Sequence, residues 1–435
     1  MKNVITLLLL ALLMPITSAA HDFEVNGIFY IINGNEATVT FYGSTYTSAN
    51  YYNDIEIPES ITYDGNTYPV TAIGDHAFYR CTEITSVIIP NTVKSIGIQA
   101  FSFCRELTSI VIPKLVSNIG NSAFEGCSGI KNLIWNAQNC PYDGAIPTSN
   151  IETITIGNEV EVVPNLFMHG SKITSLTIPS SVITIGWAAF TDSKSLTNIV
   201  VSSNNSKYDS RENCNAIIET NSNTLILGCQ NTTIPNSVTS IGERAFRNCV
   251  GLTSISIHDS ISQIGESAFS QCTGLNFIDI PNSITKIDKF VFEGCSNLVN
   301  IIIPSSVTSI CDYAFKNCTR LKSVTIGNSV TSIGQQAFNI CEVLSDINCL
   351  AETPPVISEE NCFYPSYTFA TLHVPAQSVE LYKSTPYWIR FSNIIGDATE
   401  GGSSVDPDYL KCDVNGDGEV NIADVNRVID AILNH

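Results

Sequence analysis

The sequence predicts a repeat solenoid, mostly β-strand and loop, in which one short unit stacks on copies of itself. First, the chain of 435 residues is longer than one compact core usually organises. Second, phenylalanines recur at intervals of 23 residues, as from Phe246 through Phe338. Third, each of these residues sits in the same pattern of aliphatic, glycine, alanine and cysteine positions. A unit this short cannot bury its apolar side alone, so stacked units supply the core.

Residues 1–20 are expected to be a secretory signal peptide. Lys2 supplies a positive start, the run from Val4 to Met14 is almost entirely apolar, and Ser18-Ala19-Ala20 offers small residues for cleavage. The alternative is an N-terminal membrane anchor, but the run is short for a bilayer span. No second long apolar stretch follows. We therefore expect an exported chain, secreted or at the cell surface, with no transmembrane segment after cleavage.

Composition and charge exclude two further classes. Charged residues make up 14% of the chain and hydrophobic residues 44%, so a disordered chain is not expected. The net charge is −20, and an acidic surface repels phosphate backbones. Nucleic acid is therefore not an expected partner.

Each unit contains a strand with a buried and an exposed side. In the segment LTSIVIP, Leu107, Ile110 and Ile112 are the apolar positions, and their alternation predicts that Val111 faces outward. Pro113 ends the strand, because proline cannot donate to a ladder in the middle of a sheet. Phe101, which precedes the strand, is expected to point into the core.

Eight cysteines follow the same spacing, each three residues after an anchor phenylalanine. They are Cys81, Cys104, Cys127, Cys249, Cys272, Cys295, Cys318 and Cys341. Metal ligation or disulfides are one interpretation. Their equal register in every coil favours the other, a buried column of small apolar thiols.

Units such as IPNSVTSIGERAFRNCVGLTSISI resemble the BspA-like leucine-rich repeat family of bacterial surface and secreted proteins. The resemblance implies a right-handed coil with a parallel β-sheet on one face. It implies an N-terminal β cap over residues 21–70, a repeat array over 71–350 and a C-terminal cap over 351–396. It also implies an exported protein that binds protein or glycan partners by adhesion, without naming the ligand.

The outward strand positions form two columns, from Ser86 to Asp346 and from Ile88 to Asn348, and most are small and polar. Three successive aliphatic residues break that trend, and Phe277 beside Asp279 is a second local departure, so our candidate partner-binding residues are Ile88, Val111, Ile134, Phe277 and Asp279. They are interpreted as a contact surface for a partner. The alternatives are the β-propensity of an exposed sheet, or cover from the N-terminal cap.

An insertion interrupts the array near residues 204–230, because Phe190 and Phe246 are separated by ten residues more than two units. Two strand-like runs, 216–219 and 224–227, are joined by a polar turn and predict a β-hairpin. Cys214 and Cys229 flank it, and a disulfide between them is one possibility.

The C-terminus predicts a calcium module, after a polar, acidic linker over residues 397–411. Residues 412–435 hold oxygen-bearing side chains at positions 1, 3, 5, 7, 9 and 12 of an EF-hand-like loop: Asp413, Asn415, Asp417, Glu419, Asn421 and Asp424. Gly418 permits the sharp turn, and an amphipathic helix follows. Calcium is therefore the expected cofactor.

This segment resembles half of a type I dockerin, the module that binds cohesin domains. A complete dockerin has two such units and this chain shows one, so a cohesin-like partner and a second copy of the tail both remain open. The resemblance offers an alternative function, as a component of an extracellular polysaccharide-degrading assembly. The histidines are scattered and match no catalytic motif, so we expect no enzyme.

Overall fold

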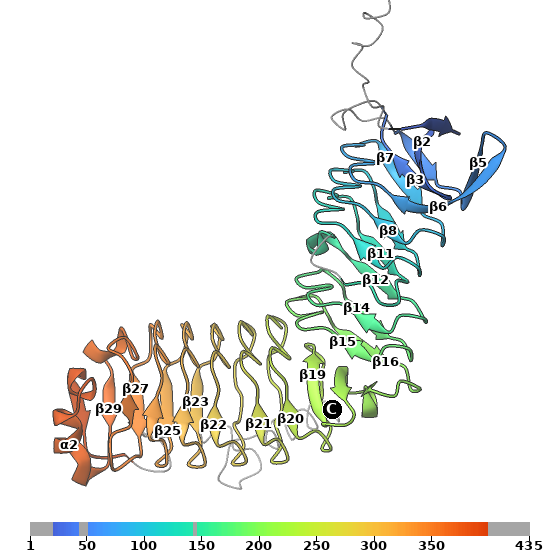
Figure 1. The fold of residues 1–435 in the computed structure, drawn as a ribbon. Coiled ribbons are helices and arrows are strands. Elements are labelled where there is room, and N and C mark those ends of the chain that lie inside the picture. Colours follow the sequence, from blue (N-terminus) through green and yellow to red (C-terminus); the bar gives the residue numbers. More distant parts are fainter. Residues whose placement is uncertain (1–20, 43–50, 142–145, 399–435) are drawn as a thin grey trace, which may run out of the picture. The chain divides into compact units, whose positions relative to one another are not determined.

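The computed structural model describes residues 21–42, 51–141 and 146–398. The expected signal peptide and the calcium loop with its six ligand residues lie outside this part of the chain. The chain divides into two compact units. The first unit contains the residues up to Asn221 together with Leu227–Asn231, and the second contains Ser222–Ile226 and the residues from Thr232 onward. In each unit, coils stack side by side, which confirms the predicted solenoid (Figure 1).

The first unit opens with a small sheet. Its strands are β1 (Phe23–Val25), β2 (Ile28–Asn33), β3 (Glu36–Thr40), β5 (Ser60–Tyr63) and β6 (Asn66–Ile73). β1, β2 and β3 pair antiparallel, and β5 pairs antiparallel with β6. β6 then pairs in parallel with β8 (Ser95–Ile96), a strand of the following coil. The opening sheet therefore continues directly into the repeat array.

Two kinds of strand recur along the array. The longer ones are β4 (Asn53–Glu56), β7 (Ile84–Ile88), β9 (Ser109–Ile112), β11 (Asn132–Trp135), β12 (Thr153–Ile156), β14 (Ser175–Ile178), β16 (Asn198–Val201), β23 (Asn300–Ile303), β25 (Ser323–Ile326), β27 (Asp346–Cys349), β29 (Thr371–His373) and β30 (Asn393–Ile395). We call the surface that they form the strand face. The two-residue strands are β8, β10 (Asn118–Ile119), β13 (Val162–Val163), β15 (Thr184–Ile185), β20 (Ser240–Ile241), β21 (Gln263–Ile264), β22 (Lys286–Ile287), β24 (Ser309–Ile310), β26 (Ser332–Ile333) and β28 (Val356–Ile357). Parallel pairing places equivalent residues of successive units side by side.

The anchor phenylalanines form a stacked column in the core. In the first unit, the rings of Phe78 and Phe101 are 4.9 Å apart and nearly parallel, and Phe124 continues the stack at 5.1 Å. In the second unit, the stack runs from Phe246 to Phe363 without a break. Because each ring occupies the equivalent position in its coil, successive rings stack in nearly the same geometry.

The stack changes where the sequence spacing changes. Phe124 and Phe167 are 43 residues apart in the sequence, three short of two units. Here Trp135, from β11, is fully buried and its ring meets Phe167 edge-on at 4.9 Å. A larger side chain from a neighbouring strand therefore fills the core at this point.

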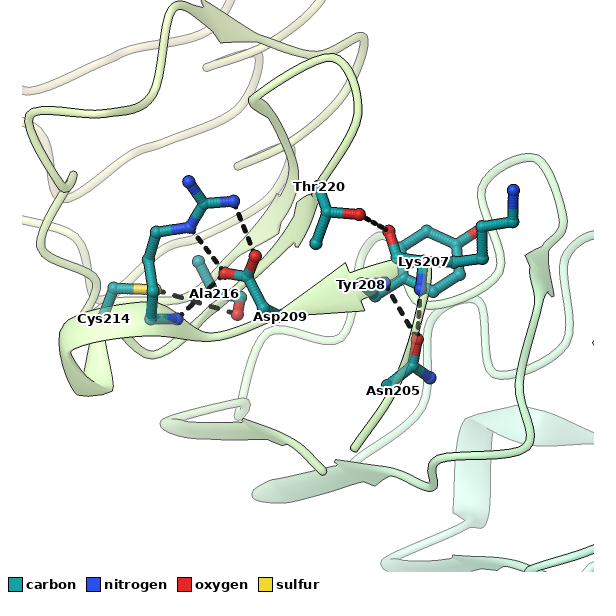
Figure 2. A network of polar contacts seen from close by, with 8 residues as sticks. Asn205, Lys207, Tyr208, Asp209, Cys214, Ala216 and Thr220 are labelled. Atoms are coloured by element: carbon teal, nitrogen blue, oxygen red, sulfur yellow. Dashed lines mark hydrogen bonds and ion pairs between the residues drawn. The ribbon is translucent and has the colours of Figure 1, made fainter. Parts of the chain in front are cut away.

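Polar contacts among residues 205–220, in the first unit, hold the start of the insertion (Figure 2). Its elements are β17 (Tyr208–Asp209), the 3-10 turn Arg211–Asn213, β18 (Ala216–Glu219) and β19 (Thr224–Gly228). The two runs expected as strands are thus both present, and β17 adds an antiparallel partner for β18 that the sequence did not predict. Asn205 Oδ1 accepts hydrogen bonds from the amides of Lys207 and Tyr208, both at 2.9 Å.

The insertion also covers one edge of the strand face. The amide of Val201, on β16, donates to Ser210 Oγ at 2.9 Å, so a side chain takes the place of the next strand. The disulfide considered between Cys214 and Cys229 is not formed. Their thiols lie 3.9 Å and 3.5 Å from the carbonyl oxygens of Ala216 and Asn215, respectively.

The last coils are covered by a short helix, α2 (Val379–Ser384), and three 3-10 turns, Ser366–Thr368, Ala376–Ser378 and Trp388–Arg390. Two buried aromatic side chains fasten this segment. Tyr382 donates its hydroxyl to Ala351 O at 2.8 Å, and Trp388 Nε1 donates to Pro355 O at 2.8 Å. The apolar end of the second unit is thereby closed.

Candidate functional site: the strand face

Buried and exposed positions alternate along the strand face as predicted. In β9, Ile110 and Ile112 are buried, whereas Ser109 and Val111 are exposed. β11 repeats this pattern, and its parallel register with β9 places Ile134 beside Val111. The outward residues of these two strands therefore lie side by side.

Three of the predicted partner-binding residues lie at equivalent positions of three successive coils of the first unit, although β7 contacts β9 without pairing with it in a ladder. Ile88 on β7 is 58% exposed, Val111 on β9 is 37% exposed and Ile134 on β11 is 39% exposed. We call these three residues the aliphatic stripe. Thr155 follows Ile134 in register and ends the run of aliphatic side chains. Three adjacent apolar side chains facing solvent favour contact with another molecule.

The neighbouring column is polar, and its side chains bond to one another from coil to coil. Thr153 Oγ1 donates to Asn132 Oδ1 at 2.6 Å, and Ser323 Oγ donates to Asn300 Oδ1 at 2.8 Å. Such pairs already use part of their hydrogen-bonding capacity within the protein. A partner that covers this column would therefore leave fewer polar groups without a hydrogen bond than if these side chains were not bonded to one another.

An acidic edge lies next to the aliphatic stripe, and the sequence reading did not single it out. Glu56 on β4 pairs in register with Ile88. Asp54 accepts hydrogen bonds from Thr85 Oγ1 at 2.6 Å and from Ser86 Oγ at 2.7 Å, and these two bonds lower the pKa of its carboxyl group. The alternating polar residues of NDIE were the available signal, but pairing β4 with β7 required the fold.

Phe277 and Asp279 are both exposed, as predicted, but they do not lie on a strand. Their segment is extended and lacks a ladder to its neighbours, which corrects the expectation of a continuous sheet here. The equivalent segment of the preceding coil, around Ser254, is not a strand either. Although Asp279 is exposed as a whole, partial burial raises the pKa of its carboxyl group.

The second unit carries further outward residues. Ile302 is 67% exposed on β23. The strand face extends beyond its predicted end at Asn348. Asn348, on β27, pairs in register with His373 on β29, and β30 follows β29. Asn348 itself is buried, contrary to its expected exposure. His373 Nδ1 lies 2.7 Å from Asp397 Oδ1, so the end of the face is polar and internally bonded.

The cysteine column is structural. Cys272 Sγ donates to the carbonyl oxygen of Phe246 in the preceding coil at 3.0 Å, and Cys295 Sγ donates to Phe269 O at 3.2 Å. Burial raises the pKa of Cys295 to about 12. A protonated, buried thiol is a poor nucleophile and a poor metal ligand. The interpretation as a column of buried thiols is confirmed.

One histidine of the described ranges lies close to a hydroxyl group and a carboxylate. His169 lies 3.0 Å from Thr191 Oγ1 and 3.3 Å from Asp192 Oδ2, but Thr191 is buried. Across the residues that the structure describes, no three potential ligands gather in a metal-binding group. The same residues include no helix of the length and apolarity needed to cross a bilayer.

The chain matches the family profile described as BspA type leucine rich repeat region. Six copies are found, over residues 40–172, 145–226 and 216–345. The matched residues span most of the array, including the aliphatic stripe and the insertion. No curated protein matches the chain.

Solved structures of bacterial proteins are similar. A leucine rich cell surface protein from Faecalibacterium prausnitzii A2-165 is 29% identical over 77% of this chain and 95% of its own, with a TM-score of 0.55. The pneumococcal vaccine antigen PcpA is 19% identical over 89% of this chain and 100% of its own, with a TM-score of 0.59. A leucine-rich repeat protein from Bacteroides ovatus ATCC 8483 is 22% identical over 87% of this chain and 100% of its own, with a TM-score of 0.50. The last two likenesses show the fold alone.

Proposed function

The chain belongs to the BspA-type leucine-rich repeat family, and from this premise we propose that it is a non-enzymatic adhesion protein that holds a protein partner on its strand face. The aliphatic stripe is the observation that carries this proposal. Ile88, Val111 and Ile134 expose apolar side chains on three successive coils, in a surface where most outward residues are small and polar. The likeness to a leucine rich cell surface protein supports a location at the bacterial cell surface.

Contact energies in protein interfaces concentrate in a few central side chains. The stripe offers such a centre in the first unit, and Phe277 offers an exposed aromatic side chain in the second. The small polar residues around them suit the rim of an interface, which keeps water out and adds hydrogen bonds. The strand face therefore provides both parts of a protein-binding surface.

The test compares two pairs of substitutions in the full chain. Val111→Asp with Phe277→Asp places charge on the proposed contacts. Thr177→Asp with Ser254→Asp is the matched control, because these exposed residues occupy the same two columns outside them. Both variants should keep the circular dichroism spectrum and melting temperature of the unaltered chain.

Binding is measured protein by protein after capture from bacterial and host surface extracts, and again with the purified partner. We expect the first pair to abolish binding and the control pair to preserve it. If both variants bind as tightly as the unaltered chain, the aliphatic stripe and Phe277 do not contact the partner, and the proposal is wrong. Glycan ligands retained by the first pair would point to a different surface.

We also propose that the tail binds calcium through the side-chain oxygens of Asp413, Asn415, Asp417 and Asp424, the backbone carbonyl of Glu419 and, at Asn421, directly or through water. Support comes from the sequence alone, in the spacing of these residues and in Gly418 at the sharp turn. Calcium would order the loop so that the following helix can dock on a cohesin-like partner or a second copy. Recruitment to a polysaccharide-degrading assembly is the alternative function that such docking would serve.

A further inference from the structure

The spacing of the aliphatic stripe restricts the shape of what it can hold. The stacked rings Phe78, Phe101 and Phe124 of these three coils follow one another at 4.9 Å and 5.1 Å, close to the spacing of paired strands, so the three side chains extend over about 10 Å. In an α-helix, residues i and i+7 lie about 10.5 Å apart, with i+3 or i+4 between them on the same face. In an extended chain, residues i and i+4 are about 13 Å apart. A helix lying across the strands therefore matches the stripe better than an extended peptide does.

The charges beside the stripe restrict the chemistry. Glu56 pairs in register with Ile88, and Asp54 lies on the same strand. Within the described residues, neither carboxylate forms an ion pair, whereas Lys131 is paired with Glu152 at 3.2 Å. Negative charge is therefore left uncompensated at the Ile88 end. The net charge of −20 also favours approach of a basic partner over an acidic one.

Resting on the proposed function, we propose that the aliphatic stripe binds an amphipathic α-helix of a basic partner protein, with the helix axis across β7, β9 and β11. Apolar side chains at i, i+3 or i+4, and i+7 contact Ile88, Val111 and Ile134. A Lys or Arg about one turn beyond the anchor on Ile88 meets Glu56. The helix supplies the apolar contacts, and the charge pair sets its direction.

The probe is a displayed library of random 16-residue peptides, selected on the immobilised full chain. The selection is depleted with the Val111→Asp chain, so that only peptides that need the stripe remain. Selected peptides are synthesised, and their affinities are measured for the unaltered chain and for Val111→Asp, Glu56→Lys and Thr177→Asp. Circular dichroism reports the conformation of each bound peptide.

We expect selected peptides to carry apolar residues at helical spacing with a basic residue one turn away, and to gain helicity on binding. Val111→Asp and Glu56→Lys should each weaken binding about tenfold or more, the size of effect expected at a central contact. Thr177→Asp should leave the affinity unchanged.

Two other outcomes separate this inference from the proposed function. Peptides with apolar residues at every second position, or without a basic residue, would overturn the helix inference and leave the strand face as the binding surface. If no selected peptide distinguishes the unaltered chain from Val111→Asp, both the inference and the role of the stripe are wrong.

Discussion

The thiol of Cys127 lies 2.9 Å from the carbonyl oxygen of Phe101 in the preceding coil and donates a hydrogen bond to it. The same oxygen accepts the amide of Cys104 at 3.1 Å, so it bonds once within its coil and once to the next. Cys318 and Cys341 make the equivalent thiol bonds to Phe292 and Phe315 in the second unit. The cysteines thus link successive coils without forming disulfides.

Removing one of these thiols should destabilise the array. Cys272→Ala loses the bond to Phe246 O and leaves a small cavity, so we expect the free energy of unfolding to fall by about 1–2 kcal/mol in urea. Cys311→Ala is the control, because Cys311 is only half-buried and lies outside the column. Equal losses for the two variants would show that the column has no special role.

Alkaline pH should destabilise the second unit. Burial raises the pKa of Cys295 and Cys362 to about 12 from an ordinary value of 9.0, so their thiols stay protonated in the folded chain while the unfolded chain ionises. Their contribution to the free energy of unfolding is fully present below pH 9 and is lost as the pH rises from 9 towards 12. Each thiol then costs up to about 1.4 kcal/mol per pH unit. Urea unfolding from pH 8 to 11 measures this slope, and Cys295→Ala should reduce it.

The insertion should depend on Asn205. Its side-chain amide donates to the carbonyl oxygens of Pro179 at 2.8 Å and Val182 at 2.9 Å, while its oxygen accepts two backbone amides (Figure 2). Asn205→Ala should therefore lower the free energy of unfolding by about 2 kcal/mol. Asn204→Ala is the matched control at an exposed neighbouring site and should change it little. Limited proteolysis should cut the insertion faster in the first variant alone.

Calcium should bind the full chain through its tail. Isothermal titration of the intact chain is expected to show saturable heat, with an increase in helicity. A chain ending at Ala398 and the Asp413→Ala variant should both lose that heat, because one lacks the loop and the other its first ligand. Heat retained by the truncated chain would place the site elsewhere, and no heat from the intact chain would exclude the calcium tail.

Much of the fold was predictable because its information is periodic. The anchor Phe101 and the alternation around Val111 recur in most units, so one coil predicts the next. The burial of the thiols also followed from their register. These features depend on contacts between equivalent residues, which the repeat itself places side by side.

Departures from the repeat could not be predicted so well, because they depend on neighbours that are distant in the sequence. Trp135 fills the core where the spacing shortens, and its role appears only when β11 is packed beside Phe167. The absence of a strand at Phe277 was not predictable, because its repeat pattern matches that of units that do form one. Glu56 became part of the candidate site only through the pairing of β4 with β7.

The most direct test of the strand face is site-specific photo-crosslinking to a captured partner. A benzophenone side chain placed at Thr155, next to Ile134 in register, reports on the aliphatic stripe. The same group at the exposed residue Glu125, on the turn that follows Phe124, reports on a different side of the coil. We predict crosslinks from residue 155 and none from residue 125. Crosslinks from residue 125 alone would contradict binding through the strand face.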